Sequence, residues 1–136
     1  MGSFALKSHI SSLGFNTAVG KNALYSMTGA RNVGIGLAAG YEATGANNVF
    51  LGCDSGYHVT SGSGNTVIGK DAGNTGTNDL TTGSNNILLG KEAAASSATV
   101  SNEVTIGNSS ITKFRIPGLG FELDTDSSSG FILDFG

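Results

Sequence analysis

The feature that most constrains the fold is a glycine-bounded unit that recurs along the chain. One copy, from Gly45 to Gly52, reads Gly-Ala-Asn-Asn-Val-Phe-Leu-Gly. The copies in the same frame occupy residues 29–36, 45–52, 62–69 and 83–90. Shorter copies lie at both ends. The glycines that close the copies are Gly20, Gly36, Gly52, Gly69, Gly90 and Gly107. They are separated by 16, 16, 17, 21 and 17 residues. Such a period is typical of stacked structural repeats.

Each copy places about four extended residues, Asn-x-x-apolar, between glycines that favour turns, which predicts one strand per coil. The residue before each closing glycine is aliphatic, and the third residue after it is small: Ala23, Ala39, Ser55, Ala72 or Ala93. Large side chains on one wall and small ones on the other describe a narrow coil. The predicted fold class is therefore all-β: a trimeric parallel β-roll or β-solenoid of about six coils, followed by a short C-terminal β module.

The predicted strands carry mostly small or apolar residues on both faces, so the direction of each side chain matters. Side chains alternate between the two faces of a strand. We expect the aliphatic residue before each closing glycine, together with Val33, Val49, Ile87 and Val104, to point into the coil. We expect the residues between them to point outward, and these are Ala18, Gly34, Phe50, Val67, Leu88 and Thr105. Strands that are apolar on both faces are normally covered on both faces.

No stretch of the sequence offers a long helix to cover the outward set, because glycine and β-branched residues interrupt every candidate. We therefore expect sister chains to cover it, in a homotrimer around a threefold axis, with other symmetric oligomers as alternatives. The candidate residues that face the trimer partners are Phe50, Val67 and Leu88. A thin coil also has too little interior to offset the ordering of its backbone, which favours an oligomer. The apolar run at residues 131–135 would promote aggregation in a monomer, so its burial between intertwined chains is an independent reason to expect one.

Three segments are expected along the chain. Residues 1–13 form a lead-in, part of it a remnant of expression cloning, and residues 14–107 form the β-roll repeats. Residues 108–136 form a C-terminal strand tip or intertwined module, with strands expected within 111–117, 121–123 and 131–135. The longest connector, 74–82, is polar and contains glycine, so it is either a projecting loop or a slack turn.

Composition excludes several classes of partner. Charged residues make up 12% of the 136-residue chain and the net charge is −3, so the chain lacks the basic character of a nucleic-acid-binding protein. No apolar run approaches the roughly 20 residues of a membrane-spanning helix, so no membrane insertion is expected. The single cysteine, Cys53, excludes an internal disulfide and a cysteine metal cluster.

The sequence gives little sign of catalysis. His9 and His58 have no neighbouring ligand at metal-binding spacing, so no metal site and no cofactor are expected. Asp54, Asp71 and Glu92 follow successive closing glycines and could form the acid pair of a glycan-cleaving enzyme. The lysines that precede Asp71 and Glu92 favour a solvated row of mixed charge instead. We therefore expect no catalytic residues and a protein that is not an enzyme.

Two further rows of residues are candidates for binding or for structure. The recurring asparagines could contact glycans, but equivalent turns favour bonds among them and to the backbone. These residues are Asn32, Asn48, Asn65 and Asn86. Three tyrosines fall 16 residues apart and, with the adjacent histidine, are candidate receptor contacts: Tyr25, Tyr41, Tyr57 and His58. They form either a stripe that contacts sugars or a stack that shields the edge of the roll.

The unit Gly-x-Asn-small-apolar-x-Ile/Leu-Gly, as in 45–52 and 83–90, resembles the head repeat of trimeric autotransporter adhesins, whose heads are left-handed parallel β-rolls. Residues 16–24 and 104–110 look more like tail-fibre proteins of tailed phages and related contractile injection systems. The resemblance covers about residues 14–118. It implies a homotrimeric fibre segment on a virion tail or an extracellular injection-system fibre, which displays a tip that binds a host cell-surface glycan or protein receptor.

Other functions remain open alongside the fibre. A head fragment of a bacterial trimeric adhesin, on the bacterial cell surface, differs from the fibre only in what flanks the segment. A tailspike that degrades polysaccharide would shorten its substrate. An ice-binding solenoid is a more distant alternative, because regular Thr-x-Thr rows are missing from the predicted strands.

Overall fold

The computed structural model describes residues 2–7, 14–119 and 121–124. These residues contain no α-helix. The first six strands are β1 (Thr17–Val19), β2 (Val33–Ile35), β3 (Val49–Leu51), β4 (Thr66–Ile68), β5 (Ile87–Leu89) and β6 (Val104–Ile106). A separate group follows and consists of β7 (Lys113–Ile116), the 3-10 turn η1 (Pro117–Leu119) and β8 (Phe121–Asp124).

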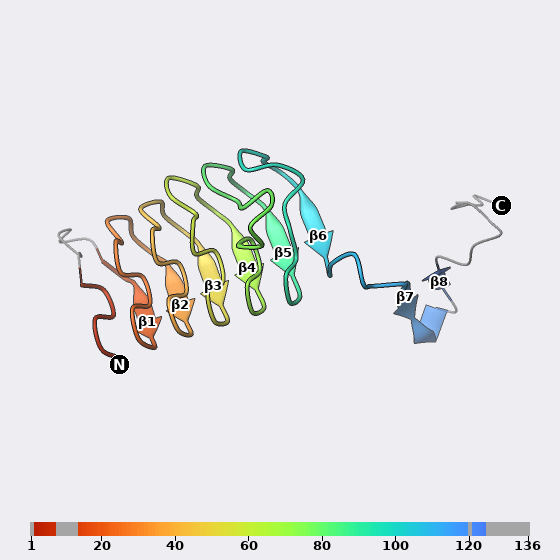
Figure 1. Cartoon of the computed structure of the whole chain (residues 1–136), viewed down its shortest axis with the longest axis horizontal. Helices are drawn as coiled ribbons and strands as arrows, with labels where there is room; N and C mark the ends of the chain where they lie inside the picture. The colour runs from red at the N-terminus through yellow and green to blue at the C-terminus, as the bar shows by residue number, and fades with distance from the viewer. Residues whose placement is uncertain (1, 8–13, 120, 125–136) are drawn as a thin grey trace.

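Strands β1 to β6 form one parallel sheet in chain order, with each strand beside the next as shown in Figure 1. Equivalent repeat positions pair directly, so that Phe50 of β3 lies opposite Gly34 of β2 and Val67 of β4. The chain is thus an all-β parallel solenoid of about five turns, which confirms the predicted class. About six coils are predicted from the sequence, but six strands bound only five complete turns.

The turns stack in register as well as the strands. The amide of Gly40 donates to the carbonyl of Ser55 at 2.9 Å, and the amide of Gly56 donates to the carbonyl of Ala72 at 2.8 Å. Parallel backbone bonds therefore continue around much of each coil. Because successive backbones lie directly over one another, several positions have no room for a Cβ atom.

The closing glycines occupy such positions. From Gly20 to Gly90 they have φ between 120° and 136°, a region that L side chains rarely adopt. A Cβ on Gly52 would also lie 2.6 Å from the carbonyl oxygen of Gly69 in the next coil. The glycines that open each unit, such as Gly45, lack a positive φ but are equally crowded by the next backbone. The two glycine rows thus set the spacing between coils.

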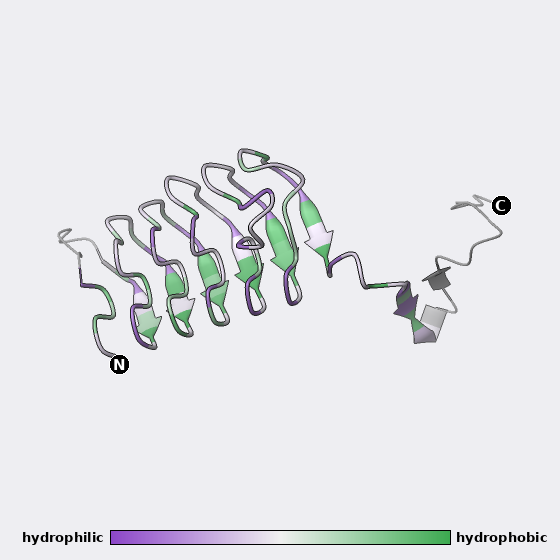
Figure 2. Ribbon diagram, viewed as in Figure 1, coloured by the Kyte–Doolittle hydropathy of each residue, from purple (hydrophilic) through white to green (hydrophobic). Residues whose placement is uncertain are grey.

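The alternation within each strand is as predicted, but the assignment of the two faces is wrong. Phe50, Val67 and Leu88 are fully buried inside the coil of their own chain, so they cannot face a trimer partner. The column before the closing glycine points out to solvent instead, with Val19 47% exposed and Ile106 54% exposed. Figure 2 shows that the strands are mostly apolar along the whole sheet, which is why hydropathy alone did not distinguish the faces.

The middle residue of each strand points into the coil, and its side chain varies in size from Gly34 to Phe50. Compensating changes in the volume of neighbouring residues make this variation possible. Phe50 fits because Gly40 and Gly56 leave space in the neighbouring turns, where a Cβ would collide with its ring. Gly34 of β2 makes room in the same way for the buried side chain of Leu24. Strand and turn therefore share one narrow interior, closed on the opposite wall by small residues such as Ala39 and Ala72.

Residues 2–7, predicted to belong to a lead-in, stack on the first coil as a partial turn. The amide of Leu6 donates to the carbonyl of Ala23 at 3.0 Å, and the amide of Asn22 donates to the carbonyl of Ser3 at 2.9 Å. Gly2 lies over Gly20 so closely that no Cβ would fit. This segment, Gly2-Ser3-Phe4-Ala5, repeats the Gly-x-x-Ala pattern that begins at Gly20, Gly36, Gly69 and Gly90.

Two parts of the described chain lie outside the regular repeat, the 74–82 connector and the pair of strands β7 and β8. The 74–82 connector projects and then returns to the coil at Leu80, which is fully buried. Its tip is closed by Asp79, whose Oδ1 accepts the amides of Thr75 at 2.6 Å and Gly76 at 2.7 Å. Strands β7 and β8 form an antiparallel pair. The expected strand at 131–135 lies outside the described residues.

Candidate functional site

The recurring asparagines form a buried ladder at the start of each strand. Oδ1 of Asn48 accepts the amide of Asn65 at 2.9 Å, and Oδ1 of Asn65 accepts the amide of Asn86 at 3.0 Å. Nδ2 of Asn65 donates to the carbonyl of Gly83 at 2.9 Å. Asn32, Asn48, Asn65 and Asn86 are all fully buried. The ladder thus satisfies backbone groups inside the turn, as the structural interpretation predicts, and the side chains cannot reach a glycan.

We expect Asn65→Ala to lower the free energy of unfolding by about 2 to 6 kcal/mol, because it leaves two buried backbone groups without partners at about 1 to 3 kcal/mol each. Asn74→Ala is the matched control, since Asn74 is only partly buried and lies outside the ladder. Urea unfolding followed by circular dichroism, at equal protein concentrations, measures both. Equal stability of the two variants would contradict the ladder.

A glutamate ends the asparagine ladder. The amide of Glu103 donates to Oδ1 of Asn86 at 2.9 Å, and Oε1 of Glu103 accepts the amide of Ser96 at 2.9 Å and the Thr105 hydroxyl at 3.1 Å. Two hydrogen bonds from Ser96 hold the pKa of Glu103 below its ordinary value of 4.5, and the bond from the Ser96 side chain has a larger effect than the bond from its amide. The ionised carboxylate is therefore favoured by folding.

This arrangement predicts a loss of stability in acid. Because the pKa of Glu103 is lower in the folded chain, its contribution is present above pH 4.5 and is lost as the pH falls through the folded value. Thermal unfolding between pH 7 and pH 3 measures the loss, and Ser96→Ala should reduce it by removing the hydroxyl that contributes most to the shift. An unchanged acid dependence in Glu103→Gln would exclude this role.

Two of the three carboxylates that follow the closing glycines lie beside lysines. Lys70 pairs with Asp71, and Nζ of Lys91 lies 3.0 Å from Oε1 of Glu92. Both lysines are more than half exposed. Asp71 and Glu92 are thus each bound by the lysine that precedes them, as expected for a row of mixed charge, whereas Oδ2 of Asp54 accepts the Cys53 thiol at 3.1 Å.

The three tyrosines form a continuous stack along successive turns. The ring centroids of Tyr25 and Tyr41, and of Tyr41 and Tyr57, lie 4.8 Å apart with interplanar angles of 14° and 11°. His58 meets the Tyr57 ring edge-on at 4.8 Å, and its Nδ1 lies 3.0 Å from Oε2 of Glu42. At the other end, Nζ of Lys7 donates to the Tyr25 hydroxyl at 2.9 Å.

This geometry limits how the tyrosine stack can bind a sugar. Both faces of the Tyr41 ring are occupied by the neighbouring tyrosines. Stacking on a sugar needs a free aromatic face, so Tyr41 can offer a ligand only its ring edge and its hydroxyl group. The arrangement fits the interpretation of a stack that shields the edge of the roll, and Tyr25, Tyr41, Tyr57 and His58 as receptor contacts stay a prediction.

The outer side of the six-stranded sheet is a continuous and mostly apolar surface. We call it the outward face, and it consists of two columns, one with Thr17, Val33, Val49, Thr66, Ile87 and Val104, and one with Val19, Ile35, Leu51, Ile68, Leu89 and Ile106. Two threonines are its only polar residues. Its side chains range from partly buried to 63% exposed at Val104. Because the strands pair in register, the columns are straight and continuous.

The described residues show no cluster of three or more His, Cys, Asp or Glu that could hold a metal ion. Within the same part of the chain, no helix is long and apolar enough to cross a membrane. Comparisons with protein-family models, with characterised proteins and with solved structures find no match to the chain. Function must therefore be argued from the surfaces described above.

Proposed function

We propose that the chain is a structural and receptor-binding segment of a homotrimeric fibre that attaches to a host cell surface without cleaving it. The observation that carries this proposal is the outward face. A straight aliphatic surface over six strands is far larger than the scattered apolar residues of a monomer surface, and such patches mark sites of association.

The chemistry of the outward face favours another copy of the same chain as its cover. It lacks charged residues, and the ion pairs of Lys70 and Lys91 lie in the turns, away from the sheet. A second copy has the same spacing between strands, about 4.8 Å, so its side chains can fit between these rung for rung. Few other partners would match a surface with this repeat along its whole length.

A three-chain arrangement lets each of the two columns of the outward face contact a different neighbouring chain, which a two-chain arrangement does not. Around a threefold axis parallel to the solenoid, one column of each sheet contacts one neighbour and the other column contacts the second neighbour. A two-chain sandwich would also cover the face, with sheets about 10 Å apart. The resemblance of the repeat to trimeric adhesin heads and to tail fibres favours the three-chain arrangement, which places the chain on a virion tail or an extracellular injection-system fibre.

Attachment is tested by incubating the fluorescently labelled chain with a panel of bacterial cells and with their purified surface polysaccharides. The proposal predicts retention on a subset of the cells and an unchanged polysaccharide length. Shortening of a polysaccharide would favour the tailspike alternative. Absence of retention on every cell type would contradict attachment. A head fragment of a bacterial adhesin would instead be retained on animal cells or matrix proteins.

A further inference from the structure

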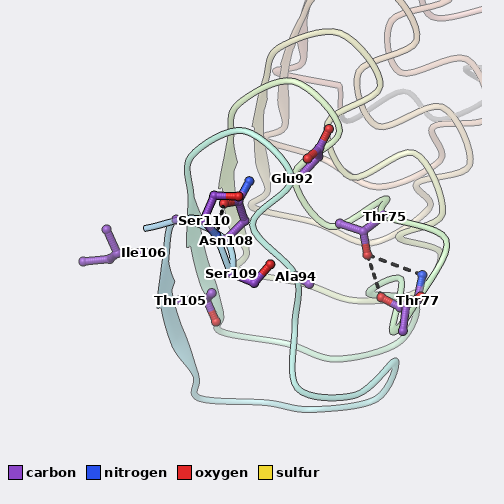
Figure 3. A pocket seen from close by; sticks show the side chains of 10 residues that line it. Thr75, Thr77, Glu92, Ala94, Thr105, Ile106, Asn108, Ser109 and Ser110 are labelled. Atoms are coloured by element: carbon purple, nitrogen blue, oxygen red, sulfur yellow. Dashed lines mark hydrogen bonds between the residues drawn. The ribbon is translucent and has the colours of Figure 1, made fainter. Parts of the chain in front are cut away.

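An open cavity lined by both polar and apolar groups lies at the C-terminal end of the solenoid, away from the tyrosine stack. It has a volume of about 560 Å³, within the range of small-ligand sites. Three segments far apart in sequence build it: the projecting loop with Thr75 and Thr77, the turn with Glu92 and Ala94, and the stretch from Thr105 to Ser110. Figure 3 shows the loop threonines across the cavity from Ser109, and the side chain of Ile106 directed away from it.

Hydrogen bonds within the chain hold much of the cavity wall in place. Asp79 fixes the loop tip, and the Thr75 hydroxyl donates to the carbonyl of Thr77 at 2.6 Å. On the opposite side, Nδ2 of Asn108 donates to the carbonyl of Lys91 at 3.1 Å, and its Oδ1 accepts the amide of Ser110 at 2.9 Å. A ligand would meet a wall that is largely formed before it binds.

The residue at the last inward position of the core is polar, unlike its aliphatic or aromatic counterparts in strands β3 to β5. Thr105 pairs in register with Leu88, so it occupies the inward position that Phe50, Val67 and Leu88 fill in earlier strands. A further apolar layer stacked on this end would favour an aliphatic residue there. The Thr105 hydroxyl donates to Oε1 of Glu103 at 3.1 Å, so the serines and the asparagine of the exit turn are the groups that would meet a polar occupant.

We infer that this cavity binds a neutral saccharide. Its polar groups are the hydroxyls of Thr75, Thr77, Ser109 and Ser110, the amide of Asn108 and the carboxylate of Glu92. Hydroxyls and amides both donate and accept, which suits the hydroxyls of a sugar, and the carboxylate can accept two of them. The methyl group of Ala94 offers a small apolar contact to the sugar ring.

Charge argues against an anionic ligand in the same cavity. None of its lining residues is basic, and the nearby Lys91 is already paired with Glu92 at 3.0 Å. A phosphate or an acidic sugar would meet the Glu92 carboxylate, and the one cation beside it is already engaged by that carboxylate. The inference rests on the proposed attachment function, for which it names the ligand class and a location other than the tyrosines.

The test uses the whole chain and immobilised glucose, galactose, mannose and N-acetylglucosamine, singly and as disaccharides, with glucuronic acid and inorganic phosphate as anionic probes. We expect at least one neutral sugar to bind. Ser109→Trp, which fills the cavity from an exposed position, should abolish that binding, and Glu92→Gln should weaken it about tenfold, equivalent to about 1.4 kcal/mol. Tyr41→Ala is the control and should leave it unchanged.

Each outcome separates this site from the fibre proposal. No binding of any neutral sugar, tighter binding of the anionic probes, or loss of binding only in Tyr41→Ala would overturn the saccharide site. Unchanged binding in both cavity variants would also overturn it. The mass of the chain in solution and its retention on cells are measured on the same samples, and they test the fibre whatever the sugar result. Circular dichroism shows whether each variant is folded.

Discussion

Gly52→Ala is expected to destabilise the solenoid by more than about 4 kcal/mol, the range of the most damaging single substitutions. Two effects combine at this position. Its φ of 135° is strained for any residue with a Cβ, and that Cβ would lie 2.6 Å from the carbonyl oxygen of Gly69. The atom in the way belongs to the backbone of the next coil, so it can move only if the stacking of the two coils is disturbed.

Three other glycines separate the two effects. Gly45→Ala tests stacking alone, because Gly45 has no positive φ but is crowded by Gly62. Gly76→Ala tests strain alone, because Gly76 has a φ of 75° and no atoms within 4 Å; it should cost about 1 to 2 kcal/mol. Gly118→Ala meets neither condition and should be neutral. If Gly45→Ala were as mild as Gly118→Ala in urea unfolding, close stacking would not set the glycine pattern.

Leu51→Glu is expected to convert the proposed trimer into folded monomers. Leu51 lies mid-sheet on the outward face and is 42% exposed in the single chain, so a carboxylate there would be hydrated in a monomer. In the trimer it would be buried without a partner, at a cost on the order of 3 kcal/mol per chain. For three chains the cost adds to about 9 kcal/mol. Since each 1.4 kcal/mol changes the association constant tenfold, association would weaken by roughly a millionfold.

Two matched variants control for the charge and for the position. Ser61→Glu adds the same charge at an exposed turn and should leave the trimer intact. Leu51→Met keeps an apolar side chain on the face and should also remain trimeric. Acidification should partly restore association of Leu51→Glu, because a glutamate titrates near pH 4.3 and burial raises that pKa. A Leu51→Glu chain that unfolds rather than dissociates would show that the face supports the coil itself.

The repeat made most of the fold predictable. Glycines such as Gly36 and Gly52 recur at positions that only a stacked backbone requires, and the asparagines recur where a turn needs buried bonds. Their spacing alone therefore identifies one strand per coil. The paired positions of Phe50 and Val67 in the structure are those that alignment of the repeats gives.

The direction of the strand side chains was not predictable from single positions. The constant aliphatic residues, such as Leu51, look like a core, and the variable column with Gly34 and Phe50 looks like a surface. The structure reverses this because Phe50 is accommodated by Gly40 and Gly56 in the turns. That compensation is visible only once strand and turn are known to face each other across one coil.

The saccharide cavity also could not be predicted from the sequence. Thr75, Glu92 and Ser109 come from three separate segments, and each is an ordinary surface residue by itself. The only signal was the length and polarity of the 74–82 connector, which indicated a projecting loop but not what it faces. The tyrosines showed the opposite case, because their regular spacing was evident in the sequence while the pairing of their ring faces was not.

Sedimentation equilibrium of the unmodified chain, over a hundredfold range of concentration, tests the central claim that copies of the chain cover the outward face. The chain has a mass of 13.6 kDa. The proposal predicts a species of three chains, about 41 kDa, that persists on dilution to the micromolar range. A folded species of 13.6 kDa at every concentration would contradict it.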